Sequence, residues 1–216
     1  RQCRSINNES IDDVVFSEKN LRVSFTKKRF CYHKPTENNN YFMLSSISSR
    51  DRKRIIKKYD YKNIENSDSE VLLDLYIKFG NKIFKIFGET FFFFFFDFDK
   101  NNAFIVRDHI GFNSIYYTKK EDSFFISSSL NNLKKNCGKN LNINYEILKK
   151  FLNLDAFSKD KTFYKDILKL PPSNVLEYKN KSISISYYPK FNDLKLSESN
   201  SSQIEGLKKM LKKAVF

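Results

Sequence analysis

The sequence predicts an α+β domain, a layered sandwich in which antiparallel strands pack together with two or three helices. Three observations support this fold class. Short runs rich in β-branched and aromatic residues recur with turn residues between them, which is typical of antiparallel strands. Residues 67–80 and 143–152 instead place apolar side chains at helical spacing. The 216 residues are 40% hydrophobic and include 23 Phe and 12 Tyr, enough to bury a core.

The N-terminal part of the chain predicts three strands and a short helical stretch. Residues 14–16 and 21–25 form a hairpin around a turn at Lys19 and Asn20. Residues 41–44 form a third, apolar strand. Residues 50–59 alternate charged side chains with isoleucines and are compatible with about one or two helical turns.

A stronger helix signal starts at Ser67. Ser67 and Glu70 have the spacing of a capping box, and Gly80 supplies a C-terminal stop. The apolar side chains behind the cap share one face: Val71, Leu72, Leu75, Tyr76 and Phe79.

The second half of the chain predicts three hairpins and two more helices. Residues 91–96 are all phenylalanine, as expected for a strand covered on both faces, and residues 103–106 pair with them. The other expected elements are a pair at 116–117 and 124–126, a helix at 143–152, a hairpin at 175–178 and 182–188, and a helix at 202–216. We expect residues 1–194 to form one domain. Residues 195–216 then comprise a polar linker at 195–202 and the first helix of a second domain.

Charge and cysteine content argue against several function classes. The net charge is +14, but most basic residues are lysines spread along the chain, so we expect no nucleic-acid partner. Cys3, Cys31 and Cys137 form no CxxC pair, and neither His33 nor His109 has a partner at metal-ligand spacing. These features predict a reducing, cytoplasmic setting with no metal site. No apolar run has the ~20 residues that a membrane span needs, so we expect no membrane association.

Several motifs follow one another in an order that points to a family. They are N-S-D-S-E-V-L at residues 66–72, the phenylalanine strand ending in Asp97, R-D-H-I-G at 107–111, F-I-S-S-S-L at 125–130 and T-F-Y-K-D-I-L-K-L-P-P at 162–172. This series resembles the class II glutamine amidotransferase domain of glutamine-hydrolysing asparagine synthetases. The resemblance extends from about residue 41 to 188, and the helix at 202–216 resembles the first helix of the ATP-dependent synthetase domain.

The resemblance implies an N-terminal-nucleophile hydrolase fold, with two antiparallel sheets packed face to face between helices. It also implies that an N-terminal Cys thiolate attacks the glutamine carboxamide, and that ammonia passes to a second domain where Mg-ATP activates aspartate. Mg-ATP is expected for that synthetase domain and no cofactor for this chain. The implied partners are glutamine, the protein's own C-terminal synthetase domain and a second copy in a homodimer.

The resemblance also assigns roles to individual residues. Asp68 corresponds to the family's ligand for the α-amine of glutamine, and Lys27 or Arg29 to its ligand for the carboxylate. Four residues receive structural roles: Glu70, Arg107, Asp108 and Gly111. Arg107 and Asp108 are expected to form an ion pair that fixes the loop turned by Gly111, with His109 as a bystander.

The sequence departs from the family pattern at the catalytic positions. The chain begins at Arg1, so we expect it to be an internal piece of a longer protein that does not itself contain the nucleophile. Leu44 and Ser45 occupy the positions of the oxyanion Asn-Gly pair, and the loss of one such donor costs ~3–4 kcal/mol. We therefore expect no glutaminase activity from this chain alone.

Two functions fit this combination, and the order of the motifs disfavours a third, a plain basic binding domain. The chain is either the amidotransferase region of an asparagine-synthetase-like protein or the non-catalytic platform of an ATP-dependent amide-forming ligase.

Overall fold

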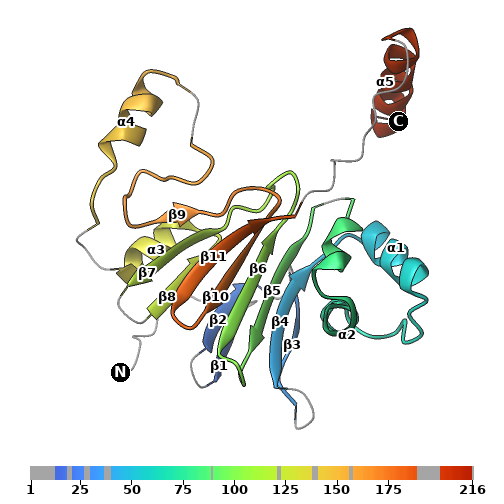
Figure 1. Cartoon of the computed structure of the whole chain (residues 1–216), viewed down its shortest axis with the longest axis horizontal. Helices are drawn as coiled ribbons and strands as arrows, with labels where there is room; N and C mark the ends of the chain where they lie inside the picture. The colour runs from blue at the N-terminus through green and yellow to red at the C-terminus, as the bar shows by residue number, and fades with distance from the viewer. Residues whose placement is uncertain are drawn as a thin grey trace.

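The computed structural model describes residues 13–18, 21–26, 30–36, 40–88, 90–120, 123–137, 141–155, 158–188 and 200–215. Its centre is a six-stranded sheet in the order β11-β10-β6-β5-β4-β3, in which every neighbouring pair is antiparallel (Figure 1). The strands are β3 (Cys31–His33), β4 (Tyr41–Ser46), β5 (Phe92–Asp97), β6 (Asn102–Arg107), β10 (Asn174–Lys179) and β11 (Ser182–Tyr187).

Two smaller antiparallel sheets accompany the large one. A three-stranded sheet has the order β8-β7-β9, and its strands are β7 (Tyr116–Lys120), β8 (Ser123–Ser127) and β9 (Leu168–Lys169). The predicted N-terminal hairpin forms a separate two-stranded sheet of β1 (Asp13–Glu18) and β2 (Leu21–Thr26). The predicted α+β class, with antiparallel sheets flanked by helices, is confirmed.

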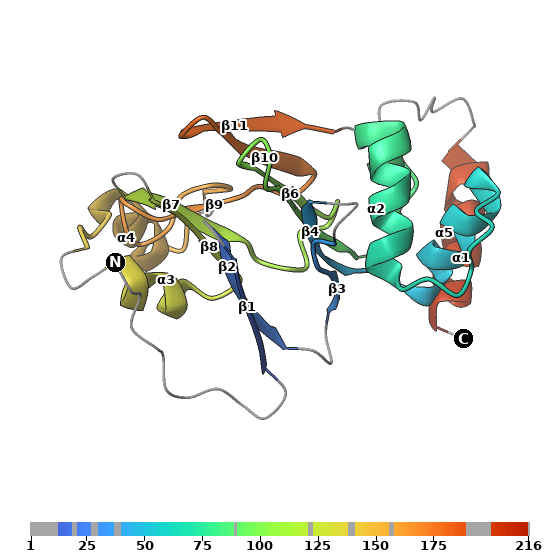
Figure 2. The same ribbon diagram turned by 90° about the horizontal axis from the view of Figure 1, so that it is seen from below.

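Each face of the large sheet has its own apolar core. One face packs against α1 (Ser49–Tyr59), α2 (Asp68–Phe79) and the 3₁₀ helix η1 (Gly80–Lys85), with Leu72 and Phe84 fully buried there. The other face packs against the three-stranded sheet through Ile115 and Tyr117. Beyond that sheet lies α3 (Leu130–Cys137), in contact with β7 and β8. Figure 2 shows this succession, with α1 and α2 at one side and α3 at the other.

The phenylalanine strand lies between these two cores. Phe93 and Phe95 belong to the core on the helix side, whereas Phe94 and Phe96 belong to the core between the sheets. Both alternate sets are needed because β5 is central and covered on both faces. The prediction that residues 91–96 alternate between two layers is confirmed.

The predicted cap of α2 is present in full. The Ser67 hydroxyl accepts a hydrogen bond from the Glu70 backbone N–H at 3.3 Å, and the Glu70 carboxylate accepts one from the Ser67 N–H at 2.7 Å. Gly80, with φ +58°, ends the helix and leads directly into η1, which the sequence did not predict.

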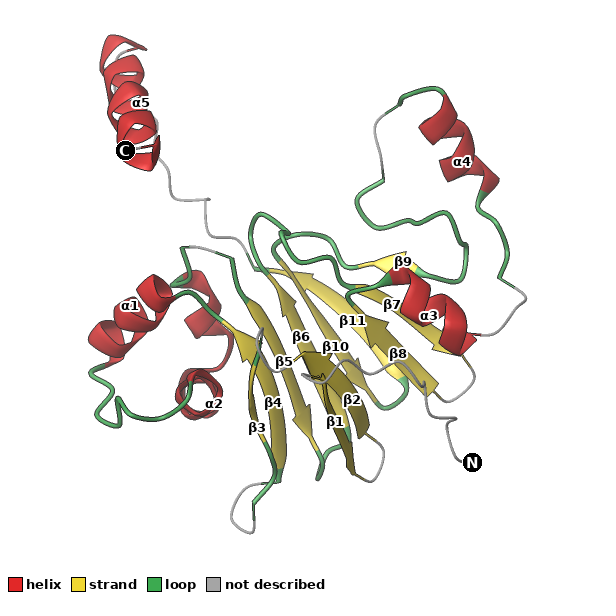
Figure 3. Cartoon of the chain, turned by 180° about the vertical axis from the view of Figure 1, so that it is seen from behind, coloured by secondary structure: helices red, strands yellow, loops and turns green. Residues whose placement is uncertain are grey.

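Other elements differ in extent from the predictions. The stretch at 50–59 forms a full helix of 11 residues. The helix predicted at 143–152 starts later, as α4 (Tyr145–Leu152), and α3, β3 and β9 were not predicted. The C-terminal helix α5 (Asn200–Val215) stands apart from the sheets in Figure 3. Most of the predicted linker lies outside the described residues, so the domain boundary stays a prediction. Within the described part of the chain, no helix combines the length and apolarity that crossing a bilayer requires.

Candidate functional site

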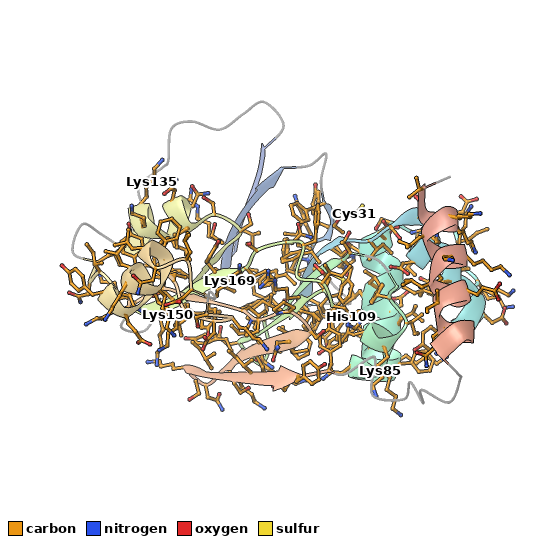
Figure 4. The ribbon with its side chains drawn as sticks, turned by 90° about the horizontal axis from the view of Figure 1, so that it is seen from above. Cys31, Lys85, His109, Lys135, Lys150 and Lys169 are labelled. Carbon is orange, nitrogen blue, oxygen red and sulfur yellow. The ribbon has the colours of Figure 1, made fainter. Side chains whose placement is uncertain are left out.

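The strand register gathers several predicted site residues at one end of the large sheet. Cys31 opens β3 opposite Ser45 near the end of β4, and Phe92 opens β5 opposite Arg107 at the end of β6. Helix α2 packs against β3 and β4, and the contact of Ser69 with Ser45 places the first residue of the helix, Asp68, at the same end. Figure 4 shows Cys31 and His109 beside α2, whereas Lys135, Lys150 and Lys169 lie on the far side of the molecule.

Asp68 is held in the first turn of α2 and is already paired with a cation. Nη1 of Arg52 in α1 donates to its carboxylate, and Nη2 of the same guanidinium donates to the backbone carbonyls of Ile64 at 2.8 Å and Asn66 at 2.6 Å. The two charged side chains are 22% and 23% exposed, so this pair lies at the surface of the site and not in the core. The Asp68 carboxylate is therefore partly accessible to solvent.

Cys31 lies next to this pair but is not poised to react. Burial raises the pKa of the Cys31 thiol, and the negative charge of Asp68 raises it further, whereas the backbone of Asp68 and the guanidinium of Arg52 act in the opposite direction. A thiol with a raised pKa is largely protonated near neutral pH and is a weak nucleophile. Cys31 therefore does not replace the N-terminal Cys that the resemblance implies.

Two small hydroxyl side chains are buried between β4 and the start of α2. The Oγ atoms of Ser45 and Ser69 lie 2.8 Å apart, and both residues are fully buried. The neighbouring Leu44 turns its side chain to the opposite face, into the core between the sheets. Both Leu44 and Ser45 lie within β4, and neither carries the side-chain amide of an oxyanion site.

The Arg107-Asp108 motif fixes a loop, though not through the expected ion pair. The Arg107 guanidinium donates to the carbonyls of Asn113 at 2.8 Å and Gly111 at 2.6 Å, and also to that of Leu170. One oxygen of the Asp108 carboxylate accepts from three successive backbone N–H groups, those of Ile110, Gly111 and Phe112. Both side chains thus bond to the backbone of the loop between β6 and β7, where each finds partners of the complementary kind.

Gly111 has a left-handed backbone conformation and lies close to neighbouring side chains. Its φ is +73°, and a Cβ there would lie 2.7 Å from Cγ of Pro172 and 2.9 Å from Nη2 of Arg107. His109 packs its ring against Tyr188, with centroids 5.1 Å apart, and its Nδ1 lies 3.3 Å from the Ser173 hydroxyl. These contacts agree with a structural position for His109.

The site includes residues that the sequence analysis did not single out, and it omits others. Arg52 lies in the charged stretch at 50–59, to which the sequence analysis assigned no site role, and only the packing of α1 beside α2 reveals its contact with Asp68. Cys3, Lys27 and Arg29 lie outside the described residues. Among the described residues, no group of three or more His, Cys, Asp and Glu side chains could hold a metal ion.

Comparison with known proteins gives this geometry a family context. Residues 50–189 match the glutamine amidotransferase domain family, a range that includes Asp68, Glu70, Arg107, Asp108 and Gly111 but begins after Leu44 and Ser45. A Methanocaldococcus jannaschii protein, named a candidate glutamine-hydrolysing asparagine synthetase, is 29% identical over 163 residues. The match covers 74% of this chain and 32% of that protein, so the chain spans about a third of the relative's length.

A solved structure gives a further match. It is the glutamine phosphoribosylpyrophosphate amidotransferase of B. subtilis complexed with ADP and GMP, at 9% identity and a TM-score of 0.43. The alignment covers 74% of this chain and 31% of that one. Because the family match spans well over half of the chain, this chain belongs to the glutamine amidotransferase domain family.

Proposed function

We propose that the chain is the amidotransferase region of an asparagine-synthetase-like protein. In this role it recognises glutamine as the nitrogen source for the ATP-dependent conversion of aspartate to asparagine, which takes place in a separate synthetase domain. The name of the M. jannaschii relative and the order of the motifs support this assignment.

The observation that carries the proposal is the position of Asp68. A carboxylate in the first turn of a helix is favourably placed in the helix dipole, and its backbone is fixed by the capping box of Ser67 and Glu70. Such a fixed carboxylate forms a charge-assisted hydrogen bond to an ammonium group. Because the carboxylate is partly exposed at the end of the large sheet, the α-ammonium of glutamine can reach it.

Titration of L-glutamine into the chain by calorimetry tests the proposal. We expect weak, saturable binding that Asp68→Asn reduces at least about tenfold, since a hydrogen bond to a charged group contributes ~1.5–3 kcal/mol. Asp74→Asn is the matched control, because Asp74 is an exposed carboxylate on the same helix. Equal affinity in the wild type and Asp68→Asn would reject Asp68 as the glutamine ligand.

A second function is favoured by Leu44 and Ser45. With Leu44 in the inter-sheet core and Ser45 bonded to Ser69, this stretch of β4 offers no side-chain amide to an oxyanion. The chain then acts as a platform that binds or docks without cleaving the amide, in a ligase that joins a different amine. Ammonia release from glutamine, measured with the full-length protein, separates the two functions. Ammonia release above the buffer background that a thiol-modifying reagent abolishes would exclude the non-catalytic platform function.

A further inference from the structure

The carboxylate assigned to the substrate ammonium is, in this chain, already bound by a guanidinium. Arg52 reaches from α1 to Asp68 in α2, and its second nitrogen holds the carbonyls of Ile64 and Asn66 in the loop between the two helices. One planar side chain thus contacts a carboxylate and two carbonyls, an arrangement that suits the fixed fork of arginine.

We infer that Arg52 is an internal plug: its guanidinium occupies the cation-binding side of Asp68 and must move away before an ammonium ligand binds there. The inference rests on the proposed function, because it concerns the same carboxylate. Beyond that function, the inference assigns to Arg52 the role of lowering the affinity of Asp68 for a ligand.

The contacts explain why Arg52 occupies Asp68 in the absence of a ligand. Arg52 is tethered to the site by its own helix, so it binds Asp68 without the loss of translational freedom that a free amino acid suffers. Its two carbonyl contacts keep the guanidinium in place even when the carboxylate is transiently free. A ligand therefore binds only the open fraction of the molecules, and its apparent affinity falls by that fraction.

The exposure of the pair explains why the plug can open. Both side chains are more than a fifth exposed, and ion pairs at such positions are weak because solvent screens them. A fully buried pair would close the site permanently. We therefore expect the plug to weaken ligand binding by roughly fivefold, the size of effect that partly exposed ion pairs produce.

The test compares L-glutamine binding to the full chain and to variants of α1. Arg52→Gln removes the cation and keeps hydrogen-bonding groups near the carbonyls of Ile64 and Asn66. The matched control is Arg50→Gln, the same substitution at an exposed position of the same helix. We expect Arg52→Gln to bind glutamine about fivefold more tightly than the wild type, and Arg50→Gln to remain within about twofold.

A second pair of variants links the gain to Asp68. Adding Asp68→Asn to Arg52→Gln should abolish the gain, because the released carboxylate is what binds the ligand. Unchanged or weaker binding by Arg52→Gln, with Asp68→Asn still weaker than the wild type, overturns the plug and leaves the proposed function intact. Absence of glutamine binding in the wild type, Arg52→Gln and Arg50→Gln rejects glutamine recognition itself, and the plug with it.

Folding of the variants is checked by thermal melting followed by circular dichroism. Arg52→Met preserves the length of the side chain and provides a second variant without the cation. If both Arg52 variants lose their cooperative transition, the guanidinium is a structural clamp and the inference is wrong.

Discussion

Glu70 ties the start of α2 to its cap and makes the stability of this helix sensitive to acid. Its hydrogen bonds with the Ser67 side chain and backbone lower the pKa of the Glu70 carboxyl below 4.5. The ionised form therefore stabilises the fold above pH 4.5, and this contribution is lost as the pH falls through the lowered pKa.

We expect Glu70→Gln to remove this part of the acid sensitivity. The variant loses a negative charge in the first turn of the helix and should be less stable than the wild type by ~0.3–1 kcal/mol at neutral pH. The difference should shrink as the pH falls below 4.5. Urea denaturation at a series of pH values measures both effects. Glu65→Gln, at an exposed position outside the helix, should follow the wild-type curve. A constant difference across the pH range would contradict the assignment.

Gly111 gives a second prediction at the scale of one residue. Gly111→Ala combines a left-handed backbone with a Cβ placed 2.7 Å from Pro172, so we expect a loss of at least ~2 kcal/mol in the free energy of unfolding. Gly206→Ala is the control, because its Cβ meets nothing within 4 Å. At that helical position alanine should stabilise α5 by up to ~1 kcal/mol. Equal effects at the two glycines would rule out the strain argument.

At the scale of the element, the central strand β5 predicts a sharp difference between two phenylalanines. Phe93→Asp buries an unpaired carboxylate at a fully buried position of the core and should abolish soluble folding. Phe112→Asp makes the same change at a side chain that is 69% exposed and should alter the unfolding free energy by no more than ~0.5 kcal/mol. Soluble expression and thermal melting compare the two. A Phe93→Asp protein that melts cooperatively would refute the placement of β5.

The elements that the sequence predicted are those with strong local signals. The capping box of α2, the apolar β5 and the β10–β11 hairpin carry their information within a few neighbouring residues. β3 and β9 are only 3 and 2 residues long, and partner strands define them more than their own side chains. α3 is only eight residues long and mostly polar, so it contains few apolar residues from which a helix could be predicted. The Arg52–Asp68 contact depends on how α1 packs beside α2, which no local pattern encodes.

At the scale of the whole molecule, α5 presents an apolar stripe with little cover. Ile204, Leu207 and Leu211 are each more than half exposed, and no described element outside α5 shares an extensive contact with it. An amphipathic helix of this kind stabilises a fold only through a partner surface. Under the proposed function, that partner is the synthetase domain.

The stripe predicts that α5 contributes little to the stability of the sheets. Leu207→Asp should leave the melting temperature of this chain within about a degree of the wild type, since exposed substitutions usually change stability by less than ~0.5 kcal/mol. Leu75→Asp, at a buried position of α2, should prevent folding. A large loss of stability in Leu207→Asp would show that α5 packs on the described sheets.

The burial of the phenylalanines in β5 does not by itself fix how this strand is aligned with its neighbours. A strand of identical side chains could slide by one or two positions along its neighbours and still send phenylalanines to most of the places in both cores. The phenylalanines thus carry little information about the correct alignment, which must come from the end of the run. There the Asp97 carboxylate accepts hydrogen bonds from the N–H groups of Asp99 and Lys100, each at 3.0 Å, and the Phe98 N–H donates to the Asn40 carbonyl at 3.1 Å. Asp97 and the Phe98–Asn40 hydrogen bond therefore fix the alignment of a repetitive strand, and the loss of Asp97 would weaken the preference for this alignment over its neighbours.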